Sequence, residues 1–140
     1  MIAVDTSGLY AVLNRDDPYH YAAEATLKAE SGLRFIPVAI LSEIAYVLES
    51  RGHTRQLLVF LQDLENGAYT RDYGEDDLPR IRALMQRYAD LRLGFADAAV
   101  IACAERHGGR VLTTDYRHFP VVGRGEGTIT VLPSFEGLGT

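Results

Sequence analysis

Residues 94–115 read GFADAAVIACAERHGGRVLTTD, with an aspartate at the edge of each of two apolar segments. The small apolar residues predict a helix over Ala96–His107, which the two glycines after it would end. The next apolar residues predict a buried strand over Arg110–Thr114. Asp97 lies at the start of the helix and Asp115 directly follows the strand. Carboxylates are costly to bury unless they are paired or bind a metal, so their position beside the core needs an explanation.

The composition is that of an ordinary globular domain. The chain has 140 residues, of which 47% are hydrophobic and 24% charged, which is enough for one hydrophobic core. We therefore expect a single domain over residues 1–140, with its core over about residues 2–132 and a loose tail after Pro133. No apolar run approaches the roughly 18 residues that span a membrane, and the N-terminus lacks a basic signal segment. Cys103 is the only cysteine, so no intrachain disulfide can form, which favours a cytoplasmic protein. Its thiol is expected to be buried and inert.

The rest of the chain alternates between strand and helix patterns. We expect strands at 2–4, 33–38, 68–73, 110–114 and 128–132. Helices are expected at 7–14, 19–30, 40–52, 54–66, 75–88 and 96–107. This order predicts an α/β fold with a mostly parallel sheet covered by helices. Between the last two strands, we expect at most a single helical turn at 116–119 and a loose glycine-rich stretch at 123–127.

Acidic residues follow two of the expected strands. Asp5 ends the first strand and Asp115 ends the strand at 110–114. The carboxyl ends of parallel strands meet at the edge of the sheet where ligands bind. Glu43 lies in the first turns of the helix after the second strand. We therefore expect an acidic group at this edge. The net charge of −5 at first argues against a nucleic-acid partner, but without this group the chain is almost neutral.

The position of Asp97 conflicts with this arrangement. We expect a helix that leads into a strand to begin at the opposite edge, which would separate Asp97 from Asp115 unless the helix lies obliquely or the sheet is short. Each acid also has a simpler possible role. Asp5 could cap a helix and Asp97 could interact with the dipole of its own helix. Asp115 could begin a turn, and Glu43 could be an exposed residue beside an apolar stripe.

Carboxylates that share one edge repel one another unless cations lie between them. Oxygen ligands without thiolate or imidazole suit Mg²⁺ or Mn²⁺, and such a site can activate water for attack on a phosphodiester. The histidines at positions 20, 53, 107 and 118 show no metal-ligand spacing, so we expect solvated or capping roles for them. The arginines nearest to the edge in sequence are candidate phosphate contacts, namely Arg15, Arg92, Arg117 and Arg124.

Three segments of the chain resemble the PIN-domain family, and most of all its VapC-type toxins from bacterial toxin–antitoxin pairs. They are VDTSGLYAVLN at 4–14, SEIAYVL at 42–48 and LGFADAAVIACAERHGGRVLTTDYRHF at 93–119. The similarity extends over about residues 2–132. It implies a Rossmann-like three-layer α/β/α sandwich and a metal-dependent endoribonuclease. It also implies that the start of the helix at Asp97 lies in the acidic pocket.

The resemblance also implies roles for individual residues. The catalytic and metal-binding residues on the family pattern are Asp5, Glu43, Asp97 and Asp115. The supporting residues are Thr6, Ser7, Thr114 and, as a structural acid behind the site, Asp90. The implied partners are an RNA substrate, a small antitoxin that places a basic side chain in the acidic pocket, and a second copy in a homodimer. The amphipathic helices at 38–66 could supply the dimer surface.

Two alternatives remain open. The chain could be a non-catalytic PIN-like module that binds RNA or protein, although four intact acids argue against this. It could also be another Mg²⁺-dependent phosphoryl-handling enzyme. A haloacid-dehalogenase-type phosphatase would have an aspartate where Ser7 stands, and a receiver domain would need a lysine late in the sheet, whereas Lys28 is the only lysine.

Overall fold

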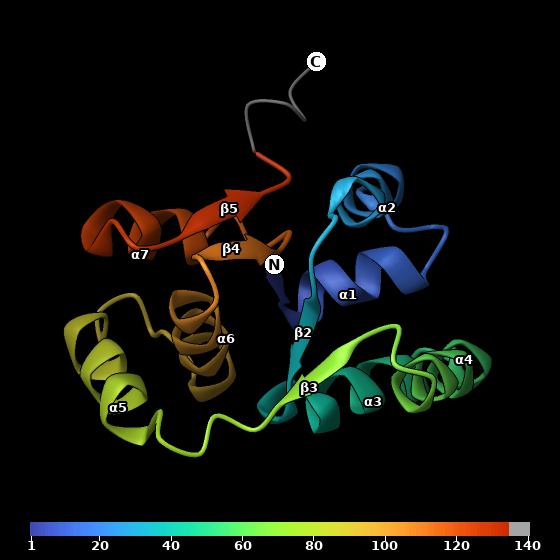
Figure 1. Ribbon diagram of the computed structural model, residues 1–140, viewed down its shortest axis with the longest axis horizontal. Helices are drawn as coiled ribbons and strands as arrows, with labels where there is room; N and C mark the ends of the chain where they lie inside the picture. The colour runs from blue at the N-terminus through green and yellow to red at the C-terminus, as the bar shows by residue number, and fades with distance from the viewer. Residues whose placement is uncertain (135–140) are drawn as a thin grey trace.

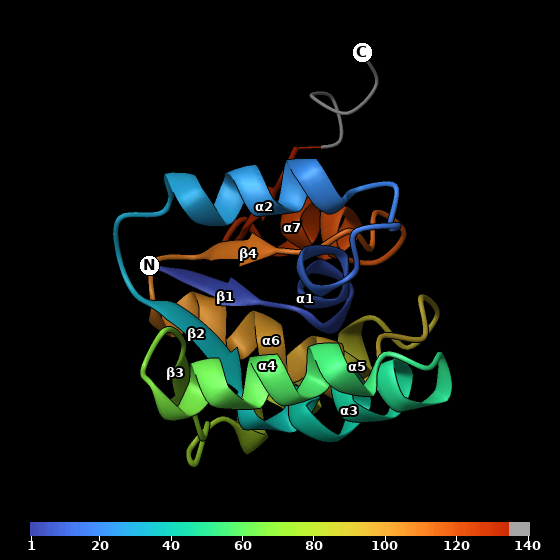
Figure 2. The ribbon, with the colours of Figure 1, turned by 90° about the vertical axis from the view of Figure 1, so that its right-hand side faces the viewer.

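A computed structural model describes residues 1–134 of the chain. Most of the predicted loose tail, residues 135–140, lies outside the described residues. The described residues contain a five-stranded sheet in the order β3-β2-β1-β4-β5, and every pair of neighbouring strands is parallel. The strands are β1 (Ile2–Val4), β2 (Arg34–Pro37), β3 (Thr70–Asp72), β4 (Arg110–Leu112) and β5 (Thr130–Leu132). The central strand β1 lies beside β4, and both run in the same direction (Figure 2).

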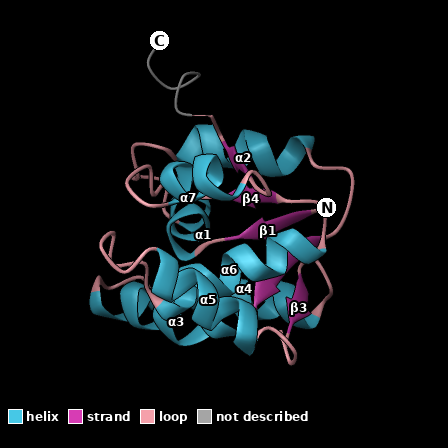
Figure 3. Ribbon diagram, turned by 90° about the vertical axis from the view of Figure 1, so that its left-hand side faces the viewer, coloured by secondary structure: helices cyan, strands magenta, loops and turns pink. Residues whose placement is uncertain are grey.

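Helices cover both faces of this sheet. Figure 1 shows α1 to α4 on one side of the strands and α5 to α7 on the other, and Figure 3 views the molecule from the side of α5 to α7. The helices are α1 (Thr6–Leu13), α2 (His20–Ala29), the 3₁₀ helix η1 (Val38–Ile40), α3 (Leu41–Ser50), α4 (Thr54–Glu65), α5 (Leu78–Arg87), α6 (Phe95–Arg106) and α7 (Phe119–Glu126). None of these helices is long and apolar enough to cross a membrane. The predicted three-layer α/β/α fold is confirmed.

The core forms where α6 packs against the centre of the sheet. All three residues of β1 are fully buried, as a strand covered on both faces requires. Seven consecutive residues of α6, Ala98–Ala104, are also buried, and four of them are alanines. Small side chains let the helix axis approach the strands closely. The alanine-rich stretch at residues 96–104 therefore forms the contact between α6 and the sheet.

The prediction of a loose glycine-rich segment at 123–127 is wrong. Residues up to Glu126 belong to α7, which begins with Pro120 in its first turn and ends at Gly127 in the left-handed conformation, with φ of 70°. Phe119 and Val122 are fully buried, and this burial outweighs the low helix propensity of the glycines. Gly125 packs against the Tyr88 ring, where a Cβ would collide with the phenol. Because α7 connects β4 to β5, the two strands are parallel.

The close packing of α1 on β4 gives a test of the fold. A Cβ on Gly8 would lie 2.5 Å from the Leu112 carbonyl oxygen, so we expect Gly8→Ala to lower the free energy of unfolding by about 1–3 kcal/mol. The matched control is Gly123→Ala in α7, whose Cβ would make an ordinary 3.6 Å contact with Ile129. We expect this control to stabilise the protein by up to about 1 kcal/mol. Urea unfolding measures both changes, and equal stability of the two variants would contradict the described packing.

Candidate active site

Four acids from four separate segments lie together at the carboxyl edge of the sheet. They line one cavity of about 310 Å³. The acidic lining residues are Asp5, Glu43, Asp97 and Asp115, joined by Asp17, and the predicted supporting residues Thr6, Ser7 and Thr114 also line it. Asp5 follows β1, and Asp115 lies three residues beyond β4. The strand order reverses between these two strands, which is the place where open parallel sheets bind ligands.

The expectation from the pattern alone, that α6 begins at the opposite edge from Asp115, is wrong, whereas the position that the family resemblance implies for Asp97 agrees with the structure. Asp97 lies in the first turn of α6 and lines the same cavity as Asp5 and Asp115. The physical reason is the direction of a crossover. A helix that connects two parallel strands runs back across the sheet, so it begins at the edge where the strands end.

Asp5 is the most deeply placed of the four acids. Its side chain does not cap α1, and only 3% of the residue is exposed. Its Oδ2 accepts hydrogen bonds from the hydroxyls of Ser7 and Thr113, each at 2.8 Å. The pKa of Asp5 is raised to about 6, chiefly by burial and also by the negative charge of Asp97, although the two hydroxyl contacts lower it. This carboxylate is therefore held in one orientation at a high electrostatic cost.

The two hydroxyls connect Asp5 to the chain that follows β4. The Thr114 backbone N–H donates to the Ser7 hydroxyl, and the Asp115 backbone N–H donates to the Thr113 hydroxyl, both at 3.0 Å. The sequence analysis named Ser7 and Thr114 as supporting residues but missed Thr113, which is fully buried. The signal that could have identified Thr113 is its position, because it is a hydroxyl residue at the buried end of an apolar strand. Thr113 fixes the spacing between the carboxylates of Asp5 and Asp115.

Asp97 and Glu43 approach the cavity from helix N-termini. The Gly94 backbone N–H donates a long 3.3 Å hydrogen bond to Asp97 Oδ2, which agrees in part with its simpler role at the helix end. Burial raises the pKa of Asp97, and the negative charges of Asp115 and Glu43 raise it further. Glu43 is exposed in the first turn of α3 and still lines the cavity. The acids are thus close enough to repel one another.

Asp115 forms a pair with His118, which the sequence analysis treated as solvated or capping. Asp115 Oδ1 accepts the backbone N–H groups of Arg117 and His118, so Asp115 does begin a turn. Its Oδ2 lies 2.8 Å from His118 Nδ1. Donor atoms of Asp97, Asp115 and His118 lie within 4.8 Å of one another. Asp115 and His118 are three residues apart in a turn. Spacing along the chain does not determine side-chain direction in a turn, so the sequence did not indicate that the two residues could bind one metal ion.

Arg51 is the other residue that the sequence analysis missed. It directly follows α3 and is the only arginine or lysine among the cavity-lining residues in the described part of the chain. Its guanidinium lies 4.9 Å from the ring centroid of Tyr10, which also lines the cavity. Glu43, Val47 and Arg51 are spaced by four residues and share one face of the helix. That spacing was the signal that could have identified Arg51.

The remaining predicted site residues lie away from the cavity lining. Arg15, Arg92 and Arg117 are exposed, and Arg124 lines a separate cavity with Tyr116 and Ile129. Asp90 is exposed in the turn after α5. None of these five is among the residues that line the acidic cavity within residues 1–134. Their predicted roles in RNA binding and support remain predictions.

The cavity has the features of a cation-binding site. Its donors are carboxylate and hydroxyl oxygens, with the His118 imidazole at one side. The Thr6 hydroxyl, which lines it, is buried and has no hydrogen-bond partner in the described structure. A single guanidinium, that of Arg51, faces the whole acidic group. The arrangement is therefore an acidic cluster with excess negative charge and an unused oxygen donor.

The burial of Asp5 predicts that the acidic group destabilises the metal-free protein. Its folded pKa of about 6 lies above the ordinary value of 3.8, so its contribution to stability is complete below about pH 4 and is lost as the pH rises through about 6. Asp5→Asn removes this cost. We expect metal-free Asp5→Asn to be more stable than the unmodified protein by about 1–3 kcal/mol at pH 7, with the difference shrinking towards pH 4.

Denaturant unfolding between pH 4 and pH 7, with a chelator present, measures this difference. Glu65→Gln, an exposed acid on α4, is the control and should leave the pH dependence unchanged. An Asp5→Asn variant that is less stable at pH 7 would show that the acid is not strained in the fold.

Comparison with known proteins agrees with this geometry. The PIN domain family model matches residues 2–125. The chain is 29% identical to Ribonuclease VapC26 of Mycobacterium tuberculosis, over 93% of this chain and 98% of that protein. The crystal structure of Mycobacterium tuberculosis VapC20, described as a sarcin–ricin loop cleaving toxin, has the same fold, with a TM-score of 0.77 at 21% identity over 88% of this chain and 95% of that one. Since the family model covers most of its length, the chain belongs to the PIN domain family.

Proposed function

We propose that this PIN domain is a metal-dependent endoribonuclease and the toxin of a type II toxin–antitoxin pair. The observation that carries the proposal is the convergence of Asp5, Glu43, Asp97 and Asp115 on one cavity. The similarity of the chain to a protein named Ribonuclease VapC26 supports the assignment. As the substrate we propose cellular RNA in the cytoplasm.

We propose that Asp5, Glu43 and Asp97 hold Mg²⁺ or Mn²⁺ and that Asp115 binds a second ion or orients water. The oxygen donors fit a hard divalent cation, as does the pKa of Asp97, which burial raises and the neighbouring acids raise further. When bound, such an ion activates water and stabilises the charge that develops on a phosphodiester during in-line displacement. The raised pKa of Asp5 means that cation binding also releases protons below about pH 6.

The remaining side chains of the cavity position the acids and the substrate. The hydroxyls of Ser7 and Thr113 fix the direction of the Asp5 carboxylate. The Asp115 carboxylate orients the His118 imidazole through Nδ1, and we assign this imidazole to accept the proton of an attacking water. Arg51 is placed to contact the phosphate, because a guanidinium presents several donors to its oxygens.

The proposal includes partners for the chain. An antitoxin with a basic side chain would enter the acidic cavity and neutralise it. The exposed apolar residues of α4, which include Leu58 (62% exposed) and Val59 (49%), fit the prediction that the helices at 38–66 supply a homodimer surface. A non-catalytic module, the main alternative, would take up no divalent cation in this cavity.

Removal of a metal-binding acid tests the activity. We expect Asp5→Asn and Asp97→Asn to remain folded and to lose at least about 100-fold in Mg²⁺-dependent RNA cleavage, because the shape is kept and the charge is removed. Mapping of RNA ends after induced expression, and with purified protein, measures the loss. Glu65→Gln should cleave as the unmodified protein does. Undiminished cleavage by Asp5→Asn would overturn the proposal.

Arg51 gives a second and independent test. Arg51→Ala should lower cleavage by about 10- to 100-fold through loss of the phosphate contact, with partial recovery in Arg51→Lys. Mg²⁺ should bind to Arg51→Ala at least as tightly as before, because a positive charge has left the cavity. Calorimetry and single-turnover cleavage separate these effects. Arg55→Ala, an exposed arginine on α4, is the control. If Arg51→Ala cleaves RNA normally, the phosphate role is wrong.

A further inference from the structure

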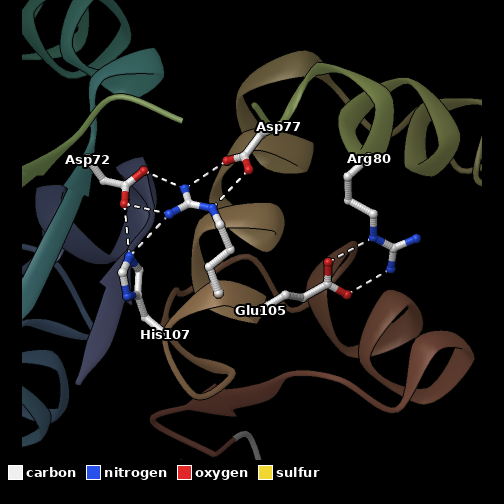
Figure 4. Close-up of polar contacts among 6 residues, drawn as sticks. Asp72, Asp77, Arg80, Glu105 and His107 are labelled. Carbon is white, nitrogen blue, oxygen red and sulfur yellow. Dashed lines mark hydrogen bonds and ion pairs between the residues drawn. The ribbon is translucent and has the colours of Figure 1, made fainter. Parts of the chain in front are cut away.

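A second group of metal-ligating side chains lies outside the acidic cavity. It contains Asp72 at the end of β3, with Cys103 and His107 from α6 and its C-cap. Donor atoms of the three side chains lie within 4.8 Å of one another. Asp72 Oδ2 is 2.9 Å from His107 Nε2, and Figure 4 shows this contact. None of the three lines the acidic cavity.

The three side chains of this group are already arranged as ligands of one metal ion would be. Cys103 and His107 are four residues apart, so their side chains lie on the same face of the helix. The His107 ring is stacked on Phe35, with ring centroids 3.7 Å apart and planes within 9°, which fixes its orientation. A cavity of about 290 Å³, lined by residues 71–77 and Arg106, opens beside Asp72. Solvent ions therefore have a route to the carboxylate.

The charges around the group do not balance. Arg106 donates to Asp72 at 2.6 and 3.0 Å and to Asp77 through two bonds of 2.8 Å, so one guanidinium serves two carboxylates. Figure 4 shows the two aspartates on either side of this shared group. Arg106 Nη1 also lies 3.3 Å from His107 Nε2, the nitrogen that faces Asp72. A donor and a carboxylate thus compete for one ring nitrogen.

A nucleophilic role for Cys103 does not fit this environment. The thiol is 1% exposed, and burial raises its pKa to about 12. A catalytic thiol would transfer its proton to His107, whose Nε2 instead contacts Asp72. Thiolate, imidazole and carboxylate together are the ligand set that zinc prefers.

We propose that Asp72, Cys103 and His107 bind one zinc ion, or a similar thiophilic divalent cation, at a site separate from the acidic cavity. Binding replaces the thiol proton, which goes to solvent, and leaves Arg106 paired with Asp77 alone. With a neutral His107 imidazole, the net charge of Asp72, Asp77, Cys103, Arg106 and His107 is minus one without the ion. It is zero when the bound ion is included and the thiol has lost its proton. Water fills the fourth position of the tetrahedron. The ion links β3 to α6.

Cobalt is the probe that distinguishes this site from the acidic cavity. The full chain is freed of metal with a chelator and titrated with Co²⁺ alone. We expect a near-ultraviolet sulfur-to-cobalt charge-transfer band that saturates at one equivalent and disappears when Zn²⁺ is added. Cys103 is the only cysteine, so this band reports on one thiolate. Asp97→Asn should keep the band, because the acidic cavity offers no sulfur ligand.

Two variants decide the outcome. Cys103→Ser should abolish the band, and His107→Gln, which changes a partly exposed side chain, should weaken Co²⁺ binding at least about tenfold. Circular dichroism confirms that each variant is folded, and if Cys103→Ser is not, His107→Gln alone decides. Absence of the band from the unmodified protein, or unchanged Co²⁺ affinity in folded His107→Gln, would overturn the proposal.

Discussion

A charged carboxylate is difficult to bury, and Asp5 is buried at the end of the central strand of this fold. Two hydroxyls hold it there, and one of them, from Thr113, is 108 residues away along the chain. Those hydroxyls in turn accept the backbone N–H groups of Thr114 and Asp115. The path of the chain after β4 is thus tied to the first acid of the cavity. The position of Asp115 therefore depends on this contact between neighbouring parallel strands.

The same sheet order explains why one helix supplies two different groups of ligands. α6 crosses the sheet beside β1, β2 and β4, and its small buried residues let it lie close to them. Its first turn places Asp97 among oxygen donors, whereas its last turn and C-cap place Cys103 and His107 beside Asp72. The carboxylate at the start of α6 is therefore kept apart from the thiol and the imidazole at the end of the same helix. The two sites would select different cations for that reason.

Most of the fold, and the shared edge of Asp5, Glu43 and Asp115, were predictable from local patterns. Asp5 and Asp115 each follow an apolar strand, and parallel strands end at one edge. The position of Asp97 followed only from the family resemblance, because the pattern alone suggested that α6 begins at the opposite edge, although crossover geometry determines its direction. α7 was not predicted because its glycines suggest a loop, whereas the burial of Phe119 and Val122 stabilises the helix. Contacts such as that of His118 depend on side-chain direction in a turn, which periodicity does not specify.

The central claim is that the acids of the PIN domain are brought together to hold a divalent cation. Anomalous diffraction from crystals of the full chain soaked in Mn²⁺ tests it most directly, because the ion itself is located. We expect a manganese peak in the cavity, bound by the carboxylates of Asp5 and Asp97. A cavity without a peak at saturating Mn²⁺, or a peak bound only by residues outside it, would show that these acids do not hold the cation.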